Sequence, residues 1–268
     1  MRSLTFDHAV SFYDKTRALP GWVSQAATDS IVNVARPNSA SQVLEIGIGT
    51  GRIALPLLRR GFPIIGIDLA MPMMEELQTK IGGNDSRVML AQADANEVPF
   101  ADATFDCVYA VHVYHLVANW QHALRDALRV VKPRGTLLIS YHYRRPHSPN
   151  RRLRDKLSEL IEPYGIDARR PGVQTSEELK TELESVVDDL KIVHVATWQE
   201  SSPVAQVLNQ LGARIFSETW AIPLDVMAQM MPPLRAWTQQ ELGDLSRVVE
   251  EDSQFNWLVA RKKRETIF

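Results

Sequence analysis

Five short apolar runs, separated by amphipathic stretches, limit the fold of this chain more than any other feature. The runs occupy residues 42–46, 63–68, 88–94, 105–111 and 136–141, and helical patterns at 51–60, 71–80 and 119–130 lie between them. Strands that are almost continuously apolar and alternate with helices form parallel sheets covered on both faces. The pattern predicts an α/β fold, a doubly wound and mainly parallel sheet of the Rossmann-like kind.

The flanking regions add helices and two more strands, which makes a seven-stranded sheet. Residues 7–35 have a helical pattern broken at Pro20-Gly21, and helices are expected near 151–162 and from Thr175 or Ser176 to about 188. Strands are expected at 191–198 and 255–263, with a helical region over 203–250 between them.

We therefore expect one α/β core with a helical lid and cap insertions placed over the carboxyl ends of the strands, where such sheets bind ligands. The predicted segments are an N-terminal helical lid (1–40), a cofactor-binding core (41–143), an inserted basic and helical segment (144–173), a helix and strand of the core (174–200), a helical cap (201–253), and a final strand and tail (254–268).

Composition narrows the class of protein. The formal net charge is −2 over 268 residues, which argues against a protein that coats nucleic acid. The single cysteine, Cys107, excludes a disulfide within the chain and favours a reducing compartment. The first residues lack the apolar core of a secretory signal, and no run of apolar residues is long enough to span a membrane. We expect a cytoplasmic protein, a monomer or homodimer, with no membrane span.

The stretch GIGTG at 47–51 follows an apolar run and opens a helical pattern. Gly47, Gly49 and Gly51 permit positive φ and present no Cβ to a ligand. The spacing differs from the G-x-G-x-x-G of dinucleotide-binding folds. Glu45 precedes the loop; its carboxylate would repel a pyrophosphate but suits a ligand with a positive amine. The alternative for such a loop is a plain tight turn.

Two acidic residues follow the next two apolar runs. Asp68 ends the second run, where its carboxylate could accept hydrogen bonds from both hydroxyls of a ribose. Asp94 ends the third, where it could accept an adenine amino proton. The alternative for both is a helix cap or turn residue.

These signals, in this order and followed by FDCVYAVHVYHLVANWQHALRDALRVVKPRGTLLIS, resemble the class I S-adenosylmethionine-dependent methyltransferases, and within them the small-molecule group of the ubiquinone- and menaquinone-biosynthesis type. The resemblance covers about residues 42–143. It implies S-adenosyl-L-methionine as cofactor and a small-molecule substrate. One departure is Arg134, where many relatives have glycine in a K-P-G-G turn.

The resemblance also implies roles for individual residues. Gly47 and Gly49 would lie against the methionine part of the cofactor, with Glu45 and the carbonyl of Val111 near its amine. Asp68 would bind the ribose, Leu69 and Met73 would flank the adenine, and Asp94 would meet its amino group beside Ala95. The opening FDHAVSFYDKTRALP resembles the lid of a subgroup, in which Tyr13 would cover the sulfonium and Arg17 would pair with the methionine carboxylate. The alternative for Arg17 is a solvated helix charge.

Methyl transfer requires alignment of the acceptor, exclusion of water and, for an acceptor that carries a proton, a base. The segment VHVYHL at 111–116 follows the fourth run and offers His115 as first catalytic candidate, His112 as second, and Tyr114. Tyr141, His142 and Tyr143 are candidates for substrate contact. The alternative for the histidines of this segment is a structural role, packed or exposed.

Two other features have alternatives. The basic run 144–156 is either a solvated face or a funnel for an anionic substrate. The Met- and Trp-containing stretch 226–237 is either core packing or the wall of an apolar acceptor site. No metal-ligand set is evident, since His112 and His115 lack a nearby carboxylate or cysteine partner, and Cys107 is expected to be a buried, inert thiol.

Three other functions remain open to test. They are an RNA or protein methyltransferase of the same fold, a nicotinamide-dependent oxidoreductase, and a non-catalytic cofactor-binding protein. The glycine spacing and Glu45 argue against the oxidoreductase. The sequence does not name the acceptor atom.

Overall fold

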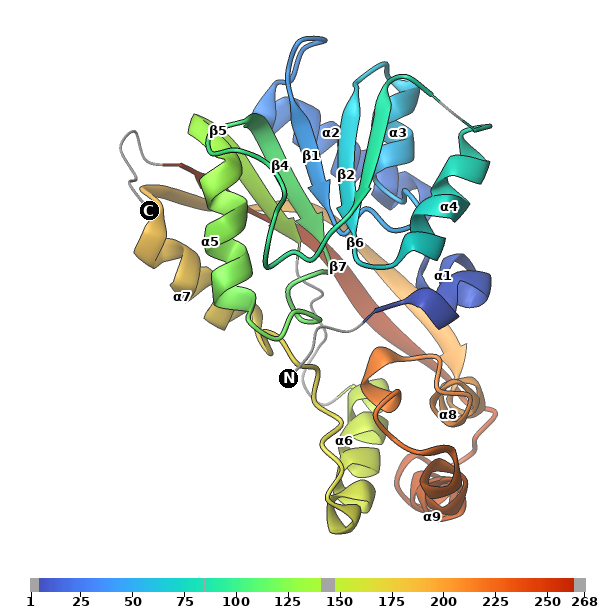
Figure 1. Cartoon of the computed structure of the whole chain (residues 1–268). Coiled ribbons are helices and arrows are strands. Elements are labelled where there is room, and N and C mark those ends of the chain that lie inside the picture. Colours follow the sequence, from blue (N-terminus) through green and yellow to red (C-terminus); the bar gives the residue numbers. More distant parts are fainter. Residues whose placement is uncertain (1–4, 84, 141–147, 263–268) are drawn as a thin grey trace. The chain divides into compact units, whose positions relative to one another are not determined.

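The protein was analysed as a computed structural model, which describes residues 5–83, 85–140 and 148–262 (Figure 1). A seven-stranded sheet has the order β3-β2-β1-β4-β5-β7-β6. Its strands are β1 (Val43–Ile46), β2 (Ile64–Asp68), β3 (Val88–Gln92), β4 (Phe105–Val111), β5 (Val131–Ser140), β6 (Asp189–Pro203) and β7 (Val248–Arg261).

The sheet has the predicted, mainly parallel topology. Strands β1 to β5 pair in parallel, and β7 runs antiparallel to β5. The chain builds outward from β1 through β2 to β3 and then returns to place β4 on the other side of β1. The carboxyl ends of β1 and β4 therefore form the switch point at which open α/β sheets bind ligands.

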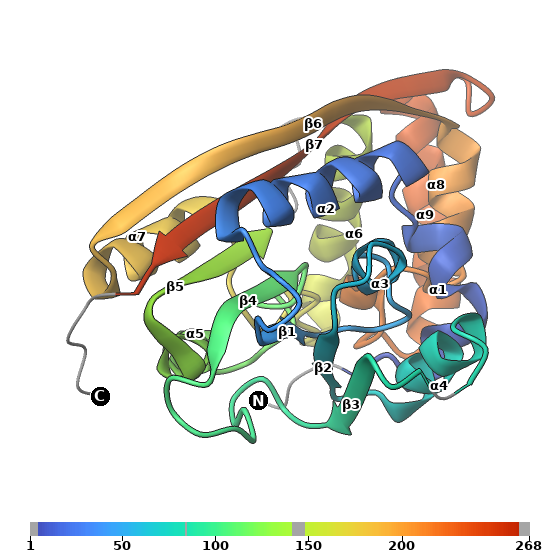
Figure 2. The same cartoon turned by 90° about the horizontal axis from the view of Figure 1, so that it is seen from above.

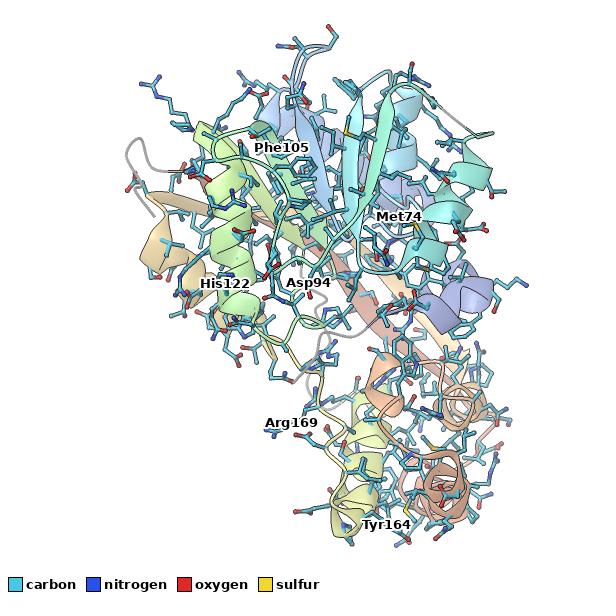
Figure 3. The ribbon with its side chains drawn as sticks, viewed as in Figure 1. Met74, Asp94, Phe105, His122, Tyr164 and Arg169 are labelled. Atoms are coloured by element: carbon cyan, nitrogen blue, oxygen red, sulfur yellow. The ribbon has the colours of Figure 1, made fainter. Side chains whose placement is uncertain are left out.

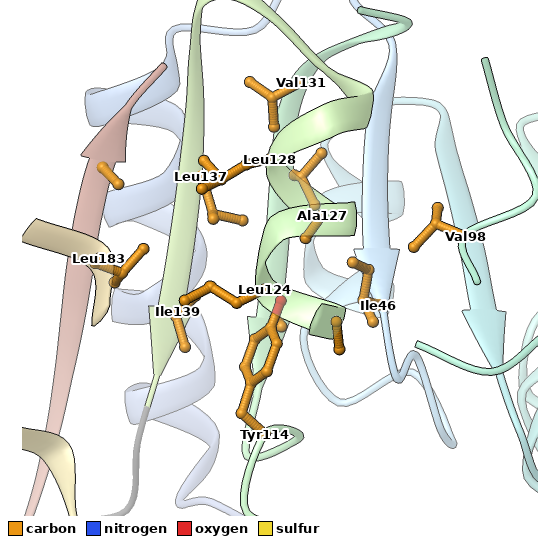
Figure 4. Close-up of a cluster of buried hydrophobic side chains, with 14 of the residues drawn as sticks. Ile46, Val98, Tyr114, Leu124, Ala127, Leu128, Val131, Leu137, Ile139 and Leu183 are labelled. Atoms are coloured by element: carbon orange, nitrogen blue, oxygen red, sulfur yellow. The ribbon is translucent and has the colours of Figure 1, made fainter. Parts of the chain in front are cut away.

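Helices cover both faces of this sheet. Figures 1 and 2 show α5 and α2 on opposite faces. The helices of this part are η1 (Asp7–Ala9), α1 (Val10–Arg17), α2 (Gly21–Ala35), α3 (Ala54–Arg59), α4 (Met71–Lys80), α5 (Trp120–Val130) and α7 (Ser176–Val186). On one face, α5 and α7 bury residues such as Leu124, Leu128 and Leu183 against the apolar side chains of the sheet (Figure 4). This burial is the main stabilising contribution to the core.

Local signals set the helix ends where they are strong. Thr175 is the N-cap of α7, and its hydroxyl accepts a hydrogen bond from the Glu178 N–H at 3.1 Å. Two acidic residues in the first turn add a favourable interaction with the helix dipole. The predicted helix start at Thr175 or Ser176 is thus confirmed.

The chain divides into two compact units. The first comprises Met1–His142, Pro171–Ala196 and Phe255–Phe268, and the second comprises Tyr143–Arg170 and Thr197–Gln254. The second unit contains α6 (Pro149–Ile161), η2 (Glu162–Tyr164), α8 (Val204–Gly212), η3 (Ser217–Thr219) and α9 (Leu224–Leu242). The predicted placement of the inserted segments over the strand ends stays a prediction.

The second unit has its own apolar cluster, which absorbs the Met-containing stretch. Val226, Met227, Met230 and Leu234 of α9 are buried in it together with residues of α6 and α8. This favours core packing for residues 226–237 over the wall of an acceptor site.

Several predicted element boundaries are wrong. Strand β5 begins at Val131 rather than at 136, and β6 extends beyond both ends of the expected strand 191–198. The helical region expected over 203–250 is divided, since α8 ends at Gly212 and α9 at Leu242, and β7 already begins at Val248 rather than at 255. The last part of the predicted cap 201–253 is therefore strand. Acidic residues give 248–254 a weak intrinsic strand preference, so pairing within the sheet decides its conformation.

The backbone at position 134 suits glycine, and the residue lies in β5 at an irregularity of the pairing with β4. Arg134 has a φ of +66°, in the left-handed region where glycine is favoured. The neighbouring Gly135 has no room for a side chain, because a Cβ there would lie 2.7 Å from Val131 Cγ1. A glycine at 134 would adopt this conformation without strain.

Candidate active site

The glycine loop, residues 47–51, connects β1 to the segment that leads into α3. Gly47, Gly49 and Gly51 have φ values of +71°, +53° and +82°. The N–H groups of Gly47 and Ile48 donate to the Ile67 carbonyl at 2.8 and 3.0 Å. The loop is thus fastened to the end of β2, and its sharp turns depend on residues without a Cβ.

The three glycines differ in what a side chain would meet. A Cβ on Gly47 would lie 2.4 Å from Val113 Cγ2, and Gly51 is equally crowded. At Gly49 the nearest atom would be Met73 Cε at 3.7 Å. Gly47 and Gly51 therefore leave no room for a side chain, whereas a Cβ at the buried Gly49 would make only ordinary contacts, and Gly47 is the half-buried member of the three.

Asp68 ends β2 and holds the loop. Its Oδ2 accepts a hydrogen bond from the Gly49 N–H at 2.8 Å, and its Oδ1 accepts one from the Ala70 N–H at 2.9 Å. Burial raises the pKa of Asp68 despite these two hydrogen bonds. Each carboxylate oxygen keeps a second lone pair, so Asp68 can also accept two hydroxyl protons from a ligand. Ala70, rather than Asp68, is the N-cap residue of α4.

Glu45 is buried on β1, only 2% exposed. The Tyr109 hydroxyl on neighbouring β4 donates to Glu45 Oε2 at 2.8 Å. Burial raises the pKa of Glu45 from its ordinary value of 4.5 to about 8, although the Tyr109 hydrogen bond and the charge of Arg52 act in the opposite direction. A positive group nearby would favour the ionised form of Glu45.

Asp94 follows β3 at the carboxyl end of the sheet. Figure 3 shows it at the opposite end from Phe105, which begins β4. Asp94 Oδ1 accepts hydrogen bonds from the backbone N–H and the side-chain amide of Asn96, both at 2.9 Å. The turn role considered for Asp94 is therefore present, and a second oxygen is available for a ligand. Ala95 beside it is half-buried and packs against the core.

Leu69 and Met73 stand between Asp68 and Asp94 in the sequence, at the start of α4. Met73 is buried in the first turn of α4, and Leu69 is half-buried. The Leu69 carbonyl accepts a hydrogen bond from the Gln92 side chain at 2.9 Å. Gln92 joins the ends of β2 and β3, and the sequence analysis did not single it out because nothing in its local pattern distinguishes it.

The N-terminal residues Tyr13 and Arg17 lie on α1. The Tyr13 ring packs edge-on against Phe6, with centroids 5.5 Å apart. The Arg17 carbonyl accepts a hydrogen bond from Arg52 Nη1 at 2.7 Å. Because Arg52 directly follows the glycine loop, this contact brings α1 to the same end of the sheet.

The segment after β4 begins with an unusual turn. Val111, at the end of β4, is buried, and His112 follows with a φ of +58°. The His112 N–H donates to the Ser140 carbonyl of β5 at 3.1 Å. The left-handed turn sets the course of the chain toward Val113, which packs on Gly47. Histidine tolerates this conformation better than most residues, but a strained residue at a ligand-binding edge is a functional candidate.

Tyr114 and His115 are both buried, at 2% and 8% exposure. The Tyr114 ring points into the apolar cluster beneath α5 (Figure 4), and its hydroxyl has no hydrogen-bond partner among the described residues. Burial raises the pKa of the Tyr114 hydroxyl above its ordinary value of 10. This placement favours a packing role for Tyr114 over a catalytic one and leaves His112 and His115 as the candidates in this segment.

A distant glycine, which the sequence analysis missed, holds this segment. The N–H groups of Gly172 and Val173 donate to the carbonyls of His115 and Tyr114 at 3.1 and 3.2 Å. A Cβ on Gly172 would lie 2.0 Å from the Tyr114 carbonyl oxygen. The Pro171-Gly172 dipeptide was the signal that could have drawn attention to it.

The remaining candidates are Tyr141, His142 and Tyr143, which lie outside the described residues. The described part of the basic run is largely paired within its own unit. Arg151 contacts Asp155 at 2.9 Å, and Arg152 contacts Glu241 at 2.9 Å. This pairing favours a solvated, ion-paired face over an anion funnel.

No group of three or more His, Cys, Asp and Glu side chains among the described residues is placed to hold a metal ion. None of the described helices has the length and apolar character needed to cross a membrane. Cys107 is buried in β4, and burial raises the pKa of its thiol to about 12, as an inert thiol requires.

The fold and the site together define a doubly wound α/β protein with its ligand edge at the carboxyl ends of β1, β2 and β4. A sequence model described as a methyltransferase domain matches residues 44–139. Residues 44–139 therefore form a methyltransferase domain, in agreement with the resemblance to the class I S-adenosylmethionine-dependent methyltransferases.

Individual similar proteins fit this assignment. A demethylmenaquinone methyltransferase of Clavibacter sepedonicus is 30% identical over 51% of this chain and 56% of its own length. The chain spans about half the length of the curated relatives it matches. The crystal structure of the YcgJ protein of Bacillus subtilis is similar with a TM-score of 0.58 and 19% identity, over 90% of this chain and 99% of that one.

A second solved structure contains a product of the cofactor. Phosphoethanolamine N-methyltransferase 2 of Haemonchus contortus, in complex with phosphomonomethylethanolamine and S-adenosylhomocysteine, has a TM-score of 0.54 and 19% identity, over 97% of this chain and 60% of that chain. At this identity the similarity concerns the fold.

Proposed function

We propose that this protein transfers a methyl group from S-adenosyl-L-methionine to a small-molecule acceptor. The observation that carries the proposal is the bond from the Gly49 N–H to Asp68 Oδ2 at 2.8 Å. It joins the glycine loop to a strand-end carboxylate with spare lone pairs, within a methyltransferase domain.

The donor set fits a nucleoside with a positive tail better than a dinucleotide. Asp68 holds the loop, and its carboxylate opposes a pyrophosphate. Glu45 on β1 interacts with Asp68, and a positive group of a ligand would favour its ionised form. Asp68 would hold the ribose, Leu69 and Met73 the adenine, and Asp94 with Ala95 the adenine amino group. Gly47, Gly49, Glu45 and the Val111 carbonyl would hold the methionine part, covered by Tyr13 and Arg17.

In this proposal the bound cofactor supplies a methyl group already activated by a positive sulfur. The chain's own residues then hold the acceptor in line and exclude water. Two histidines of this segment are the candidates to take a proton from an acceptor. They are His115, whose carbonyl accepts from the Gly172 N–H, and His112, which has a left-handed backbone. We retain His115 as the first candidate base.

Small molecules are favoured as acceptors for two reasons. The similar proteins act on small molecules, among them demethylmenaquinone and phosphoethanolamine by their names. The chain also has a net charge of −2, which disfavours RNA as a partner.

Two experiments test the proposal in order. Calorimetry with S-adenosylhomocysteine is expected to show binding, while NAD gives no thermal shift; the reverse result would favour an oxidoreductase. Labelled S-adenosyl-L-methionine is then incubated with hydroquinones, phenols, amines and an RNA pool. Transfer to RNA alone, or binding without transfer to any acceptor or extract, would contradict the small-molecule assignment.

The variant His115→Ala identifies the base once an acceptor is found. It is expected to lower turnover while leaving S-adenosylhomocysteine affinity near that of the wild type. Unchanged turnover would remove His115 from the mechanism, and His112→Ala is the next variant to measure.

A further inference from the structure

Helix α1 carries Tyr13 and Arg17, the two residues proposed to cover the cofactor. Burial of its side chains does little to stabilise its position. None of its eight residues, Val10–Arg17, is buried. A helix this short is unstable alone in water. Its position must therefore depend on specific contacts, and polar contacts from Asp14 are prominent among them.

Asp14 lies between Tyr13 and Arg17 along α1 and reaches the glycine loop. Its Oδ1 accepts a hydrogen bond from the Thr50 hydroxyl at 2.6 Å. Thr50 stands between Gly49 and Gly51 and is 2% exposed. The contact thus connects α1 to the centre of the loop at a buried side chain.

Lys80 completes the cluster from the end of α4. Its ammonium donates to Asp14 Oδ2 and, at 3.1 Å, to the Thr50 carbonyl. Burial alone would raise the pKa of Asp14, but the hydrogen bonds from Lys80 and Thr50 outweigh it and lower this pKa. Asp14 is therefore an ionised acceptor for two donors from two different elements, the stronger kind of hydrogen bond.

We propose that Asp14, Thr50 and Lys80 form a clasp that seats α1 on the glycine loop and so slows release of the cofactor. Asp14 is a positioning residue: it holds Tyr13 and Arg17 in place rather than contacting the ligand. The consequence for the cofactor rests on the proposed function, whereas the seating of α1 does not.

The test compares variants at both ends of the main contact. Thr50→Val removes the hydroxyl at nearly constant shape, and Thr50→Ser retains it. Asp14→Ala removes the acceptor. We expect Asp14→Ala and Thr50→Val each to raise the dissociation rate of S-adenosylhomocysteine about 10-fold, as for loss of a hydrogen bond to a charged group. Thr50→Ser stays near the wild type, and the double variant Asp14→Ala/Thr50→Val adds little to either single change.

Asp29→Ala is a matched control. Asp29 on α2 pairs with Arg60 after α3, and its side chain is exposed to a similar degree, 52% against 47% for Asp14. This control removes an ion pair between an N-terminal helix and the core without touching the loop. It is expected to leave the dissociation rate unchanged.

A second readout needs no ligand. Trypsin cleavage after Lys15 in the ligand-free protein is expected to accelerate in Asp14→Ala and Thr50→Val but not in Thr50→Ser or Asp29→Ala. Equal cleavage in all variants overturns the clasp. If the wild type binds no S-adenosylhomocysteine, the proposed function fails while the cleavage rates still decide the clasp. If cleavage accelerates but dissociation does not, α1 is seated by Asp14 without controlling the cofactor, and the proposal is wrong in that part.

Discussion

At the glycine loop the chain turns on residues that have no side chain, whereas just after β4 it turns on His112, with a φ of +58°. The two regions meet, since Val113 packs where a Cβ of Gly47 would lie. The loop is held mainly by neighbours close in the fold, β2 and Asp68. The segment after β4 is held by Ser140 and by the distant Gly172.

Under the proposed function, this difference accounts for how one fold can keep its cofactor and change its acceptor. The backbone conformation of the loop requires glycine at several positions, so few residues there can be replaced. The acceptor side is shaped by side chains on a segment that long-range contacts position, and such a surface can change while the sheet stays the same.

The strongest test of the cofactor side is Asp68→Ala. It is expected to weaken S-adenosylhomocysteine binding by about 2–3 kcal/mol, because it removes charge-assisted hydrogen bonds to the ligand and to the loop. This corresponds to roughly 30- to 150-fold in Kd by calorimetry. Asp106→Ala is the control, since Asp106, like Asp68, accepts a hydrogen bond from a backbone N–H but lies at the amino end of β4, where Lys132 is its second donor. Wild-type binding by Asp68→Ala would exclude the ribose role.

Gly47→Ala tests the contact between the two regions. The new Cβ would press on Val113, and we expect the free energy of unfolding to fall by about 1–3 kcal/mol beyond the effect of the backbone conformation. Gly61→Ala supplies that reference, because Gly61 has a φ of +87° and nothing within 4 Å of its Cβ position. The double variant Gly47→Ala/Val113→Ala should recover part of the lost free energy of unfolding, measured by urea denaturation. No recovery would show that the two regions are not coupled at this contact.

Glu45 should give the cofactor side a characteristic pH dependence. Its pKa is raised by burial from 4.5 to about 8, with Tyr109, Arg52 and Asp68 as the charged or titratable groups facing it. Between these values the folded protein holds a proton that the unfolded chain has lost, so this contribution to stability is full below 4.5 and is lost as pH rises to about 8. The slope should approach about 1.4 kcal/mol per pH unit at most.

Binding should respond to pH in the opposite direction. The ligand's positive amine favours ionised Glu45, so affinity for S-adenosylhomocysteine should increase as pH rises toward 8. Glu45→Gln should flatten both the unfolding and the binding profiles. Profiles that keep their slopes in this variant would assign the proton to another group.

The smallest expected effect concerns Arg134 and His112, two non-glycine residues with a left-handed backbone. Replacing each by glycine separates the role of the backbone conformation from the role of the side chain. Arg134→Gly should increase the free energy of unfolding by about 0.5–1 kcal/mol, because φ is +66° and the position is remote from the loop. His112→Gly relieves the same kind of backbone strain at the acceptor side but removes the imidazole. If denaturation shows both variants stabilised and only His112→Gly loses turnover, the imidazole, not the turn, serves the reaction; equal turnover would make His112 a turn residue only.

Much of the fold was predictable because it depends on local pattern. Apolar runs bounded by glycine and acidic residues located β1 to β4, and Thr175 located the start of α7. The prediction failed where pairing overrides propensity, as at residues 248–254, which are strand in spite of their acidic residues.

The residues of the candidate site also divide into those whose contacts could be predicted from sequence and those whose contacts could not. The contact of Asp68 with Gly49 joins residues that follow adjacent parallel strands, and the motif order predicted their neighbourhood. Tyr114 could not be judged from sequence, since only the packing under α5 determines that its hydroxyl points into the core. Asp14 is part of the quoted lid pattern, but its partners Thr50 and Lys80 are 36 and 66 residues away.

By itself the sequence determined the class of sheet, the positions at which the backbone must turn without a Cβ, and the acidic residues that follow the strands. These are properties of neighbouring residues: hydrophobic period, allowed φ and charge. Only the tertiary structure decided which buried groups pair, that Glu45 shares a proton-sensitive contact with Tyr109, and that Gly172 holds His115. Such contacts depend on distances between segments far apart in the chain, and no local preference encodes them.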